Sequence, residues 1–127
     1  MAQKTLLGDK PLEADVLKSI LEYLTWKRVF HFRVNSGAFT IERNQFIRFG
    51  ARGCPDILAV YPATGLFWGI EVKRPGGLLS DAQVEFLRGI HANGGIATVA
   101  ESVCDVEAVL TDPNHPNLER YRSVLGF

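Results

Sequence analysis

The chain has 127 residues, which suggests one domain over residues 1–127, because domains commonly hold about 100–200 residues. Its 46% hydrophobic and 22% charged residues are close to a globular average, which excludes disorder of the whole chain. Two distant cysteines exclude a disulfide scaffold, and no apolar run approaches the roughly 20 residues that span a bilayer, so no membrane is expected as a partner. The first ten residues lack the long apolar segment of a secretory signal, so we expect a cytoplasmic protein with reduced thiols.

The charges balance, with 14 basic and 14 acidic residues, which argues against a broadly basic surface that binds nucleic acid. Their distribution is uneven. Residues 1–26 carry 3 basic and 4 acidic side chains, residues 27–74 carry 8 and 3, and residues 75–127 carry 3 and 7. The middle third is therefore basic, and each of the few acids within it needs its own explanation.

Hydrophobic spacing and turn residues predict an alternation of helices and strands. In chain order these are a helix over 11–26, a strand over 29–35, a turn over 36–38, an irregular strand or loop over 39–48, a tight loop over 49–54, strands over 56–61 and 66–74, a helix from about 80 to 91, a strand over 96–100, a helix over 103–110 and a short helix over 118–125. Ser80, followed by Gln83, is a capping-box pattern that marks the start of the second long helix.

The principal elements follow the order α-β-β-β-α-β-α, which predicts an α/β fold. Residues 66–100 form a strand–helix–strand unit, which favours a parallel pair with a right-handed crossover. The hairpin before it adds antiparallel strands. We therefore expect a mixed β-sheet flanked by helices, with a core over about 11–110 and a C-terminal extension over 111–127.

One strand carries an unusual pair of charges. Glu71 and Lys73 are two residues apart, so both project to one face of a strand that is otherwise apolar. One interpretation is a salt bridge on the solvent face of an edge strand. The other is a functional pair, and the choice depends on what lies beside them.

Asp56 stands at the start of the neighbouring strand, after Pro55, which fixes the backbone there. Pairing the two strands about a turn at residues 62–65 brings Asp56 to the level of Glu71 and Lys73. Two carboxylates and one ammonium then converge. Like charges at this distance need a positive group between them, and a divalent cation bound by oxygen ligands fits.

The Pro55-Asp56 pair and the Glu71-Val72-Lys73 run resemble the PD-(D/E)xK signature of metal-dependent nucleases. Further segments resemble the VRR-NUC (virus-type replication–repair nuclease) family, from about residue 13 to residue 110. They are Gly50-Ala51-Arg52-Gly53-Cys54-Pro55-Asp56-Ile57-Leu58, Ile70-Glu71-Val72-Lys73-Arg74, Leu79-Ser80-Asp81-Ala82-Gln83 and Asn93-Gly94-Gly95. The resemblance implies a core like that of restriction endonucleases.

The resemblance also implies further site residues. An acid on the leading helix is expected, and Glu13 and Asp15 are the two candidates. We choose Glu13, which lies beside the buried face. The alternative is that Glu13 merely complements the helix dipole. Gln83 is expected to face the active site, or merely to cap its helix. The backbone carbonyl of Val72 is implied as a metal ligand. Glycines before Pro55, Gly50 and Gly53, are expected to allow close backbone approach and positive φ.

The implied reaction is phosphodiester hydrolysis with Mg²⁺, for which Mn²⁺ should substitute. Asp56 and Glu71 would hold the metal, Glu13 would act directly or through a water, and Lys73 would orient or help deprotonate the attacking water. The sequence has no phosphate-binding loop motif, so no nucleotide cofactor is expected. Five arginines suit a track for the phosphodiester backbone: Arg33, Arg43, Arg48, Arg52 and Arg74.

Two other functions stay open: a catalytically silent module that binds DNA or protein, and a nuclease of another type, such as a flap or restriction nuclease. Small members of the family resemble structure-specific, often dimeric enzymes that act on branched DNA such as four-way junctions in replication and repair. We therefore expect branched DNA as substrate and a homodimer, in a bacterial or phage-infected cell. The apolar tail over 118–127 either joins the dimer interface or caps the core of its own chain.

Overall fold

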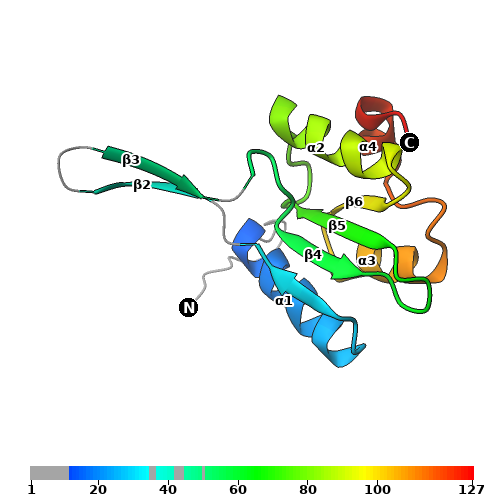
Figure 1. Cartoon of the computed structure of the whole chain (residues 1–127). Helices are drawn as coiled ribbons and strands as arrows, with labels where there is room; N and C mark the ends of the chain where they lie inside the picture. Colours follow the sequence, from blue (N-terminus) through cyan, green and yellow to red (C-terminus); the bar gives the residue numbers. More distant parts are fainter. Residues whose placement is uncertain (1–11, 35–36, 42–44, 50) are drawn as a thin grey trace, which may run out of the picture.

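The computed structural model describes residues 12–34, 37–41, 45–49 and 51–127. The elements, in chain order, are α1 (Glu13–Trp26), β1 (His31–Arg33), β2 (Gly37–Ile41), β3 (Gln45–Phe49), β4 (Ile57–Val60), β5 (Phe67–Val72), α2 (Asp81–Ala92), β6 (Ile96–Ala100), α3 (Val103–Thr111) and α4 (Glu119–Leu125) (Figure 1). The predicted α/β class and element order are confirmed. No helix within the described ranges is long and apolar enough to cross a membrane.

The main sheet has four strands in the order β1-β4-β5-β6. The β1–β4 and β4–β5 pairs are antiparallel, whereas β5 and β6 are parallel, so the predicted mixed sheet and the parallel strand–helix–strand unit are both confirmed. β5 is therefore an interior strand, hydrogen-bonded on both sides. This overturns the interpretation of the Glu71–Lys73 pair as an edge-strand salt bridge.

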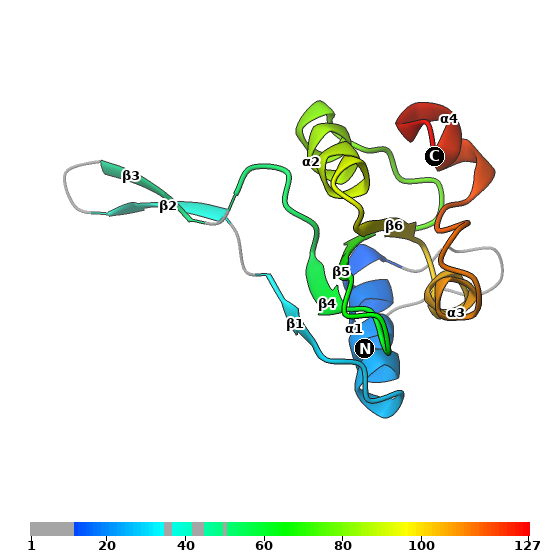
Figure 2. The same cartoon turned by 45° about the vertical axis from the view of Figure 1, so that its right-hand side comes forward.

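Helices cover both faces of this sheet, as Figures 1 and 2 show. On one face, α1 packs against β1 and β5, and α3 packs against α1 and β6, in a core that includes Ile20, Trp68 and Val106. On the other face, α2 and α4 pack over β6, with Leu87 and Val99 among the buried residues. Side chains alternate between faces along a strand, so β6 contributes to both cores.

Residues 37–49 differ from the prediction. The predicted turn over 36–38 is wrong at Gly37 and Ala38, which belong to β2, and the predicted irregular segment over 39–48 pairs as an antiparallel hairpin of β2 with β3. Aromatic and β-branched residues fill both strands, which favours this pairing. The hairpin projects from the body of the molecule (Figure 1).

The C-terminal segment folds back on its own chain. Tyr121 and Leu125 of α4 are buried in the second core, and Phe127 packs against it, whereas Val124 is exposed. Arg88 of α2 donates hydrogen bonds to the carbonyls of Val124 and Leu125 at 2.7 and 3.1 Å. The alternative in which the tail caps its own core is therefore confirmed.

Candidate metal and active site

The β4–β5 hairpin fixes the position of Asp56. Ile57 pairs with Ile70, so the preceding residue, Asp56, falls at the level of Glu71, as the short hairpin predicted. The Asp56 Oδ2 atom accepts a hydrogen bond of 2.8 Å from the Val72 backbone N–H. The carboxylate therefore continues the strand pairing by one step and is held against the end of β5.

Glu71 is 2% exposed on the interior strand. Its Oε2 atom accepts a hydrogen bond of 3.0 Å from Gln83 Nε2 and lies 3.8 Å from the Lys73 ammonium. Its Oε1 atom is buried and has no hydrogen-bond partner among the residues that the structure describes. A buried carboxylate oxygen without a partner is costly, and a bound cation would offset that cost.

Electrostatics lead to the same conclusion. Burial, and next the charge of Asp56, raise the pKa of Glu71 to about 9, although Lys73 acts in the opposite direction. The charge of Lys73 alone therefore does not offset burial and the charge of Asp56 at this carboxyl group. A divalent cation with oxygen ligands would supply further positive charge and would partner the Oε1 atom, so Asp56 and Glu71 fit a metal site.

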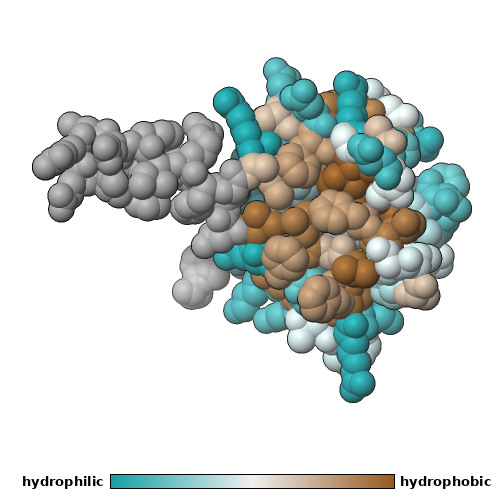
Figure 3. All heavy atoms as spheres, viewed as in Figure 1, coloured by the Kyte–Doolittle hydropathy of each residue, from teal (hydrophilic) through white to brown (hydrophobic). Residues whose placement is uncertain are grey.

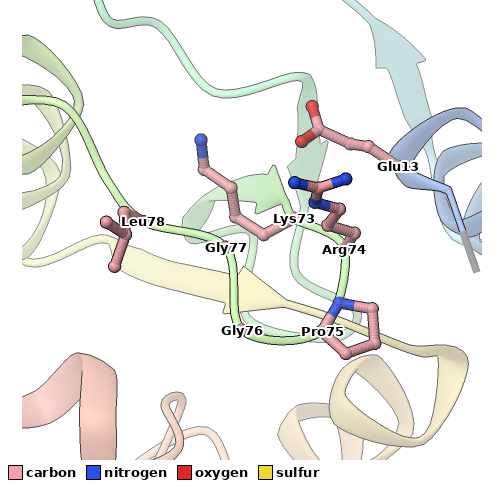
Figure 4. Close-up of a pocket in the computed structure, with 7 residues that line it drawn as sticks. All are labelled: Glu13, Lys73, Arg74, Pro75, Gly76, Gly77 and Leu78. Atoms are coloured by element: carbon pink, nitrogen blue, oxygen red, sulfur yellow. The ribbon is translucent and has the colours of Figure 1, made fainter. Parts of the chain in front are cut away.

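Glu13, in the first turn of α1, reaches the same region. It lines a cavity of about 560 Å³ together with six consecutive residues after β5, Lys73, Arg74, Pro75, Gly76, Gly77 and Leu78 (Figure 4). Its charge contributes to the raised pKa of Glu71. Within the described ranges, however, no three acidic, histidine or cysteine side chains are grouped closely enough to hold a metal. The choice of Glu13 over Asp15, and a water-mediated role for it, stay predictions.

Gln83 satisfies both of its predicted contacts at once. Its backbone N–H donates to Ser80 Oγ at 3.2 Å, and its side-chain Oε1 accepts from the Ser80 N–H at 2.9 Å, so the capping box is confirmed. The Nε2 end of the same amide donates to Glu71. The start of α2 therefore positions the buried carboxylate.

The glycine-rich approach to the site also has a physical basis. Gly53 adopts φ +78°, and a Cβ atom there would lie 2.2 Å from the carbonyl oxygen of Ala82. Only glycine allows this loop to approach the first turn of α2 so closely. Gly50, for which the same role was predicted, lies outside the described residues.

We expect Gly53→Ala to lower thermal stability much more than Gly65→Ala. Both glycines have φ +78°, but a Cβ atom at Gly65 would meet nothing within 4 Å. The left-handed conformation alone costs about 1–2 kcal/mol, and the clash at Gly53 adds to this. Thermal unfolding followed by circular dichroism measures both variants, and equal losses would contradict the close approach to α2.

Cys54 lies between this glycine and Pro55 and is partly buried. Burial, and then the charges of Glu71 and Asp56, raise the pKa of its thiol. A protonated thiol is a poor nucleophile and a poor metal ligand. Cys54 is therefore suited to packing rather than to catalysis or metal binding.

The five predicted DNA-contacting arginines have different outcomes. Arg74 is exposed and lines the cavity beside Lys73 (Figure 4). Arg33 of β1 and Arg52 are exposed, and Arg48 lies in β3, where its backbone pairs with Ala38. Arg43 lies outside the described residues. Their roles in binding DNA stay predictions.

The wall of the cavity was missed by sequence reasoning. The Pro75-Gly76-Gly77 run after β5 forms a tight turn in which the Gly77 N–H donates to the Arg74 carbonyl at 2.8 Å. Gly76 has φ +82°. Proline followed by glycine at the two central positions is typical of a type II turn, and this signal could have revealed the turn.

A buried glutamate on an interior strand, beside a second carboxylate and with a lysine two residues on, has the residue types of the metal-dependent nuclease signature that the sequence resembles. The comparison with protein families gives the same class: the model of the VRR-NUC domain matches residues 11–104. The chain therefore belongs to the VRR-NUC family, a nuclease family for which DNA is the implied substrate. The matched segment contains the whole candidate site and ends before α4. A comparison with curated proteins found no match.

Proposed function

We propose that the protein is a Mg²⁺-dependent DNA endonuclease that hydrolyses phosphodiester bonds in branched DNA, such as four-way junctions, during replication or repair in the cytoplasm of a bacterial or phage-infected cell. The observation that carries the proposal is the position of Asp56, hydrogen-bonded to the Val72 N–H, beside the buried Glu71, whose Oε1 atom has no partner among the described residues. This carboxylate pair stands beside Lys73, at the edge of a cavity with basic residues.

Asp56, Glu71 and the Val72 carbonyl would hold the metal, with Glu13 acting directly or through a water. When bound, Mg²⁺, or Mn²⁺ in its place, would neutralise the negative charge that develops on the phosphoryl oxygens. Gln83 holds the Glu71 carboxylate in place. The Val72 N–H does the same for Asp56.

Lys73 would act on the attacking water. Its side chain lines the cavity, and its ammonium lies 3.8 Å from Glu71. In hydrolysis, the water oxygen bonds to phosphorus, the bond from phosphorus to the leaving oxygen breaks, and a proton leaves the water. Lys73 would orient that water as the ammonium or, as the neutral amine, accept the proton, and the leaving oxygen would take up a proton from solvent. Arg74, in the same cavity, would bind a neighbouring phosphate.

The decisive assay incubates the purified protein with linear, flapped and four-way DNA in the presence of Mg²⁺, Mn²⁺ or EDTA. The expected result is cleavage with either metal, none in EDTA, and a preference for the four-way junction. If flaps or linear DNA are cleaved faster than the four-way junction, that DNA would be assigned as the substrate instead. DNA binding without cleavage in either metal would instead identify a silent binding module.

We further propose that the enzyme is a homodimer, because the two cuts that resolve a four-way junction need two active sites. The tail is buried in its own chain, but four residues of β1, β4, β5 and the adjoining loop remain exposed on one sheet face. These residues, the apolar sheet face, are Phe30, Phe32, Val60 and Phe67, with exposed fractions of 72, 55, 41 and 48%. Figure 3 shows apolar side chains gathered over the region where Figure 1 places β4 and β5.

The strand register supports a single continuous surface. Val60 is paired with Phe67, and Phe32 with Leu58, so these side chains share one face of the sheet. All four residues of the apolar sheet face are uncharged, whereas DNA is bound through cations. A second copy of the chain, packed about a two-fold axis, suits such an aromatic centre.

We expect Phe32→Asp to convert a dimer into a monomer, because it places a charge within the apolar sheet face. Light scattering at tens of micromolar should give twice the chain mass of 14.1 kDa for the wild type and 14.1 kDa for the variant. Val124→Asp, on the exposed side of α4, is the matched control and should remain dimeric. A monomeric wild type would remove the dimer, and a monomeric Val124→Asp protein would move the interface to the tail.

A further inference from the structure

The tight turn after β5 is built onto the end of the parallel strand pair. The Lys73 N–H donates to the Ala100 carbonyl at 2.9 Å, which extends the β5–β6 pairing by one residue. The chain then reverses over Arg74–Gly77 and forms one wall of the cavity (Figure 4). This turn, residues 74–77, is therefore anchored to the sheet at its start.

The far end of the turn lies against the lysine itself. A Cβ atom added at Gly77 would be 3.1 Å from Lys73 Cβ and 3.2 Å from Lys73 Cδ. Gly77 is thus in contact with the aliphatic stem that carries the ammonium group. A displacement of the turn would change the space available to this stem.

Two residues from outside the site hold the turn in place. Glu101 is 8% exposed, and its Oε2 atom accepts a hydrogen bond of 3.0 Å from the Gly76 N–H. The hydroxyl oxygen of Tyr121 lies 2.8 Å from the Gly77 carbonyl oxygen and 2.6 Å from Glu101 Oε2. Its single proton can be donated to either acceptor. Arg120 pairs with Glu101 through two of its nitrogens, Nη2 with Oε1 and Nε with Oε2, the latter at 3.0 Å.

The protonation states of Glu101 and Tyr121 match these contacts. Burial opposes the ionisation of Glu101, but hydrogen bonds from Arg120, Tyr121 and Gly76 outweigh it and lower its pKa. Burial, and next the bond to Glu101, raise the pKa of Tyr121 to about 12. At neutral pH the carboxylate is therefore an acceptor and the phenol keeps its proton, as the contacts require.

The tyrosine is held independently of its hydroxyl group. Its ring belongs to the second core, and α4 is fixed to α2 by the hydrogen bonds of Arg88. Removal of the hydroxyl group alone should therefore leave α4 in place. This helix lies beyond residues 11–104, which match the family model.

We infer that Tyr121 and Glu101 are positioning residues for Lys73: they hold the turn over residues 74–77 against the lysine stem and so fix the ammonium beside Glu71. The inference rests on the proposed nuclease activity, in which Lys73 acts on the attacking water. It assigns a role in catalysis to a helix that shares no residue with the cavity wall.

The test compares Tyr121→Phe with Tyr61→Phe. Tyr61 is an equally buried tyrosine whose hydroxyl group donates to the Val109 carbonyl at 2.7 Å, in the opposite core. We expect Tyr121→Phe to lower kcat about 10-fold with little change in KM for DNA, because positioning acts on the chemical step. Tyr61→Phe should leave kcat within about 2-fold. Amide hydrogen exchange at Gly76 and Gly77 should be faster in Tyr121→Phe alone, a readout that needs no activity.

Two further variants trace the effect to Lys73. In a Lys73→Ala background, Tyr121→Phe should reduce the residual single-turnover rate by less than about 2-fold, because residues that act through one another are not additive. Gly77→Ala adds a methyl group against the lysine stem and should lower kcat. This variant tests the inference even if Tyr121→Phe folds poorly. Unchanged kcat in Tyr121→Phe and Gly77→Ala, or full additivity with Lys73→Ala, would overturn the inference. A wild type that cleaves no DNA would instead overturn the proposed function.

Discussion

An Asp56→Asn protein is expected to bind DNA but to lose cleavage below detection. Asparagine has the same shape as aspartate, and its amide oxygen can still accept the hydrogen bond from the Val72 N–H, which measures 2.8 Å in the wild type. The β4–β5 register should therefore survive. The negative charge that would help to hold a divalent cation beside Glu71 is lost, and with it the stabilisation of charge on the phosphoryl oxygens.

Cleavage of four-way DNA in Mg²⁺, with circular dichroism as the check on folding, measures this effect. Asp112→Asn is the matched control, because Asp112 is exposed and pairs with His115 outside the site; its turnover should equal that of the wild type. Lys73→Ala should still bind Mg²⁺ but cleave about 100-fold more slowly, the usual scale for a lost acid–base group. Near-normal turnover in Asp56→Asn would disprove the assignment of Asp56.

The level of Asp56 could be predicted from sequence because it depends on local geometry. A short turn between two strands fixes which residues are opposite each other, so the spacing from Asp56 to Glu71 sufficed. The same holds for the Ser80–Gln83 capping box, which is a pattern within four residues. Both features place site residues, and both follow from neighbours in the chain.

The burial of Glu71 could not be predicted in this way. Whether β5 is an edge or an interior strand depends on its parallel pairing with β6, which comes after a whole helix in the sequence. Alternation along β5 gives the face of each residue but not what covers that face. The sequence therefore supports both interpretations of the Glu71–Lys73 pair equally, and only the tertiary structure distinguishes them.

The packing of the tail and the contacts of Gly76 and Gly77 could not be predicted from sequence for the same reason. The apolar residues of α4 fit a dimer interface and an internal core equally well, because hydrophobicity does not specify the partner. The contacts of Glu101 and Tyr121 with the turn join positions that are 25 and 44 residues apart. No local pattern connects such positions, so sequence reasoning had no means of linking them to Lys73.

The buried carboxylate also predicts an unusual effect of Glu71→Gln: the variant should lose cleavage and yet be more stable than the wild type in EDTA. The pKa of Glu71 is raised from 4.5 to about 9 in the folded chain. Between these values the folded state holds a proton that the unfolded state has released, so the free energy of unfolding falls as the pH rises. Glutamine carries no charge and escapes this loss.

Thermal unfolding of both proteins in EDTA at pH 5 and pH 8 measures the effect. The two midpoints should be close at pH 5, and at pH 8 the Glu71→Gln protein should melt at least about 3 °C higher, on a scale of a few degrees per kcal/mol. Glu85→Gln, an exposed change on α2, is the matched control and should show no such divergence. A variant less stable than the wild type at pH 8 would mean that Lys73 already compensates the charge of Glu71.

Added Mg²⁺ should reverse the order of the two proteins. A ligand that binds the folded state alone raises stability in proportion to the logarithm of its concentration, so the wild-type midpoint should rise with Mg²⁺. The Glu71→Gln protein lacks the second carboxylate and should respond little. The residue that destabilises the metal-free chain would then be the one through which metal stabilises it, as expected if the buried Oε1 atom of Glu71 faces the cation. A wild-type unfolding midpoint that does not change with Mg²⁺ concentration would contradict a metal site at Asp56 and Glu71, whatever the cleavage assay shows.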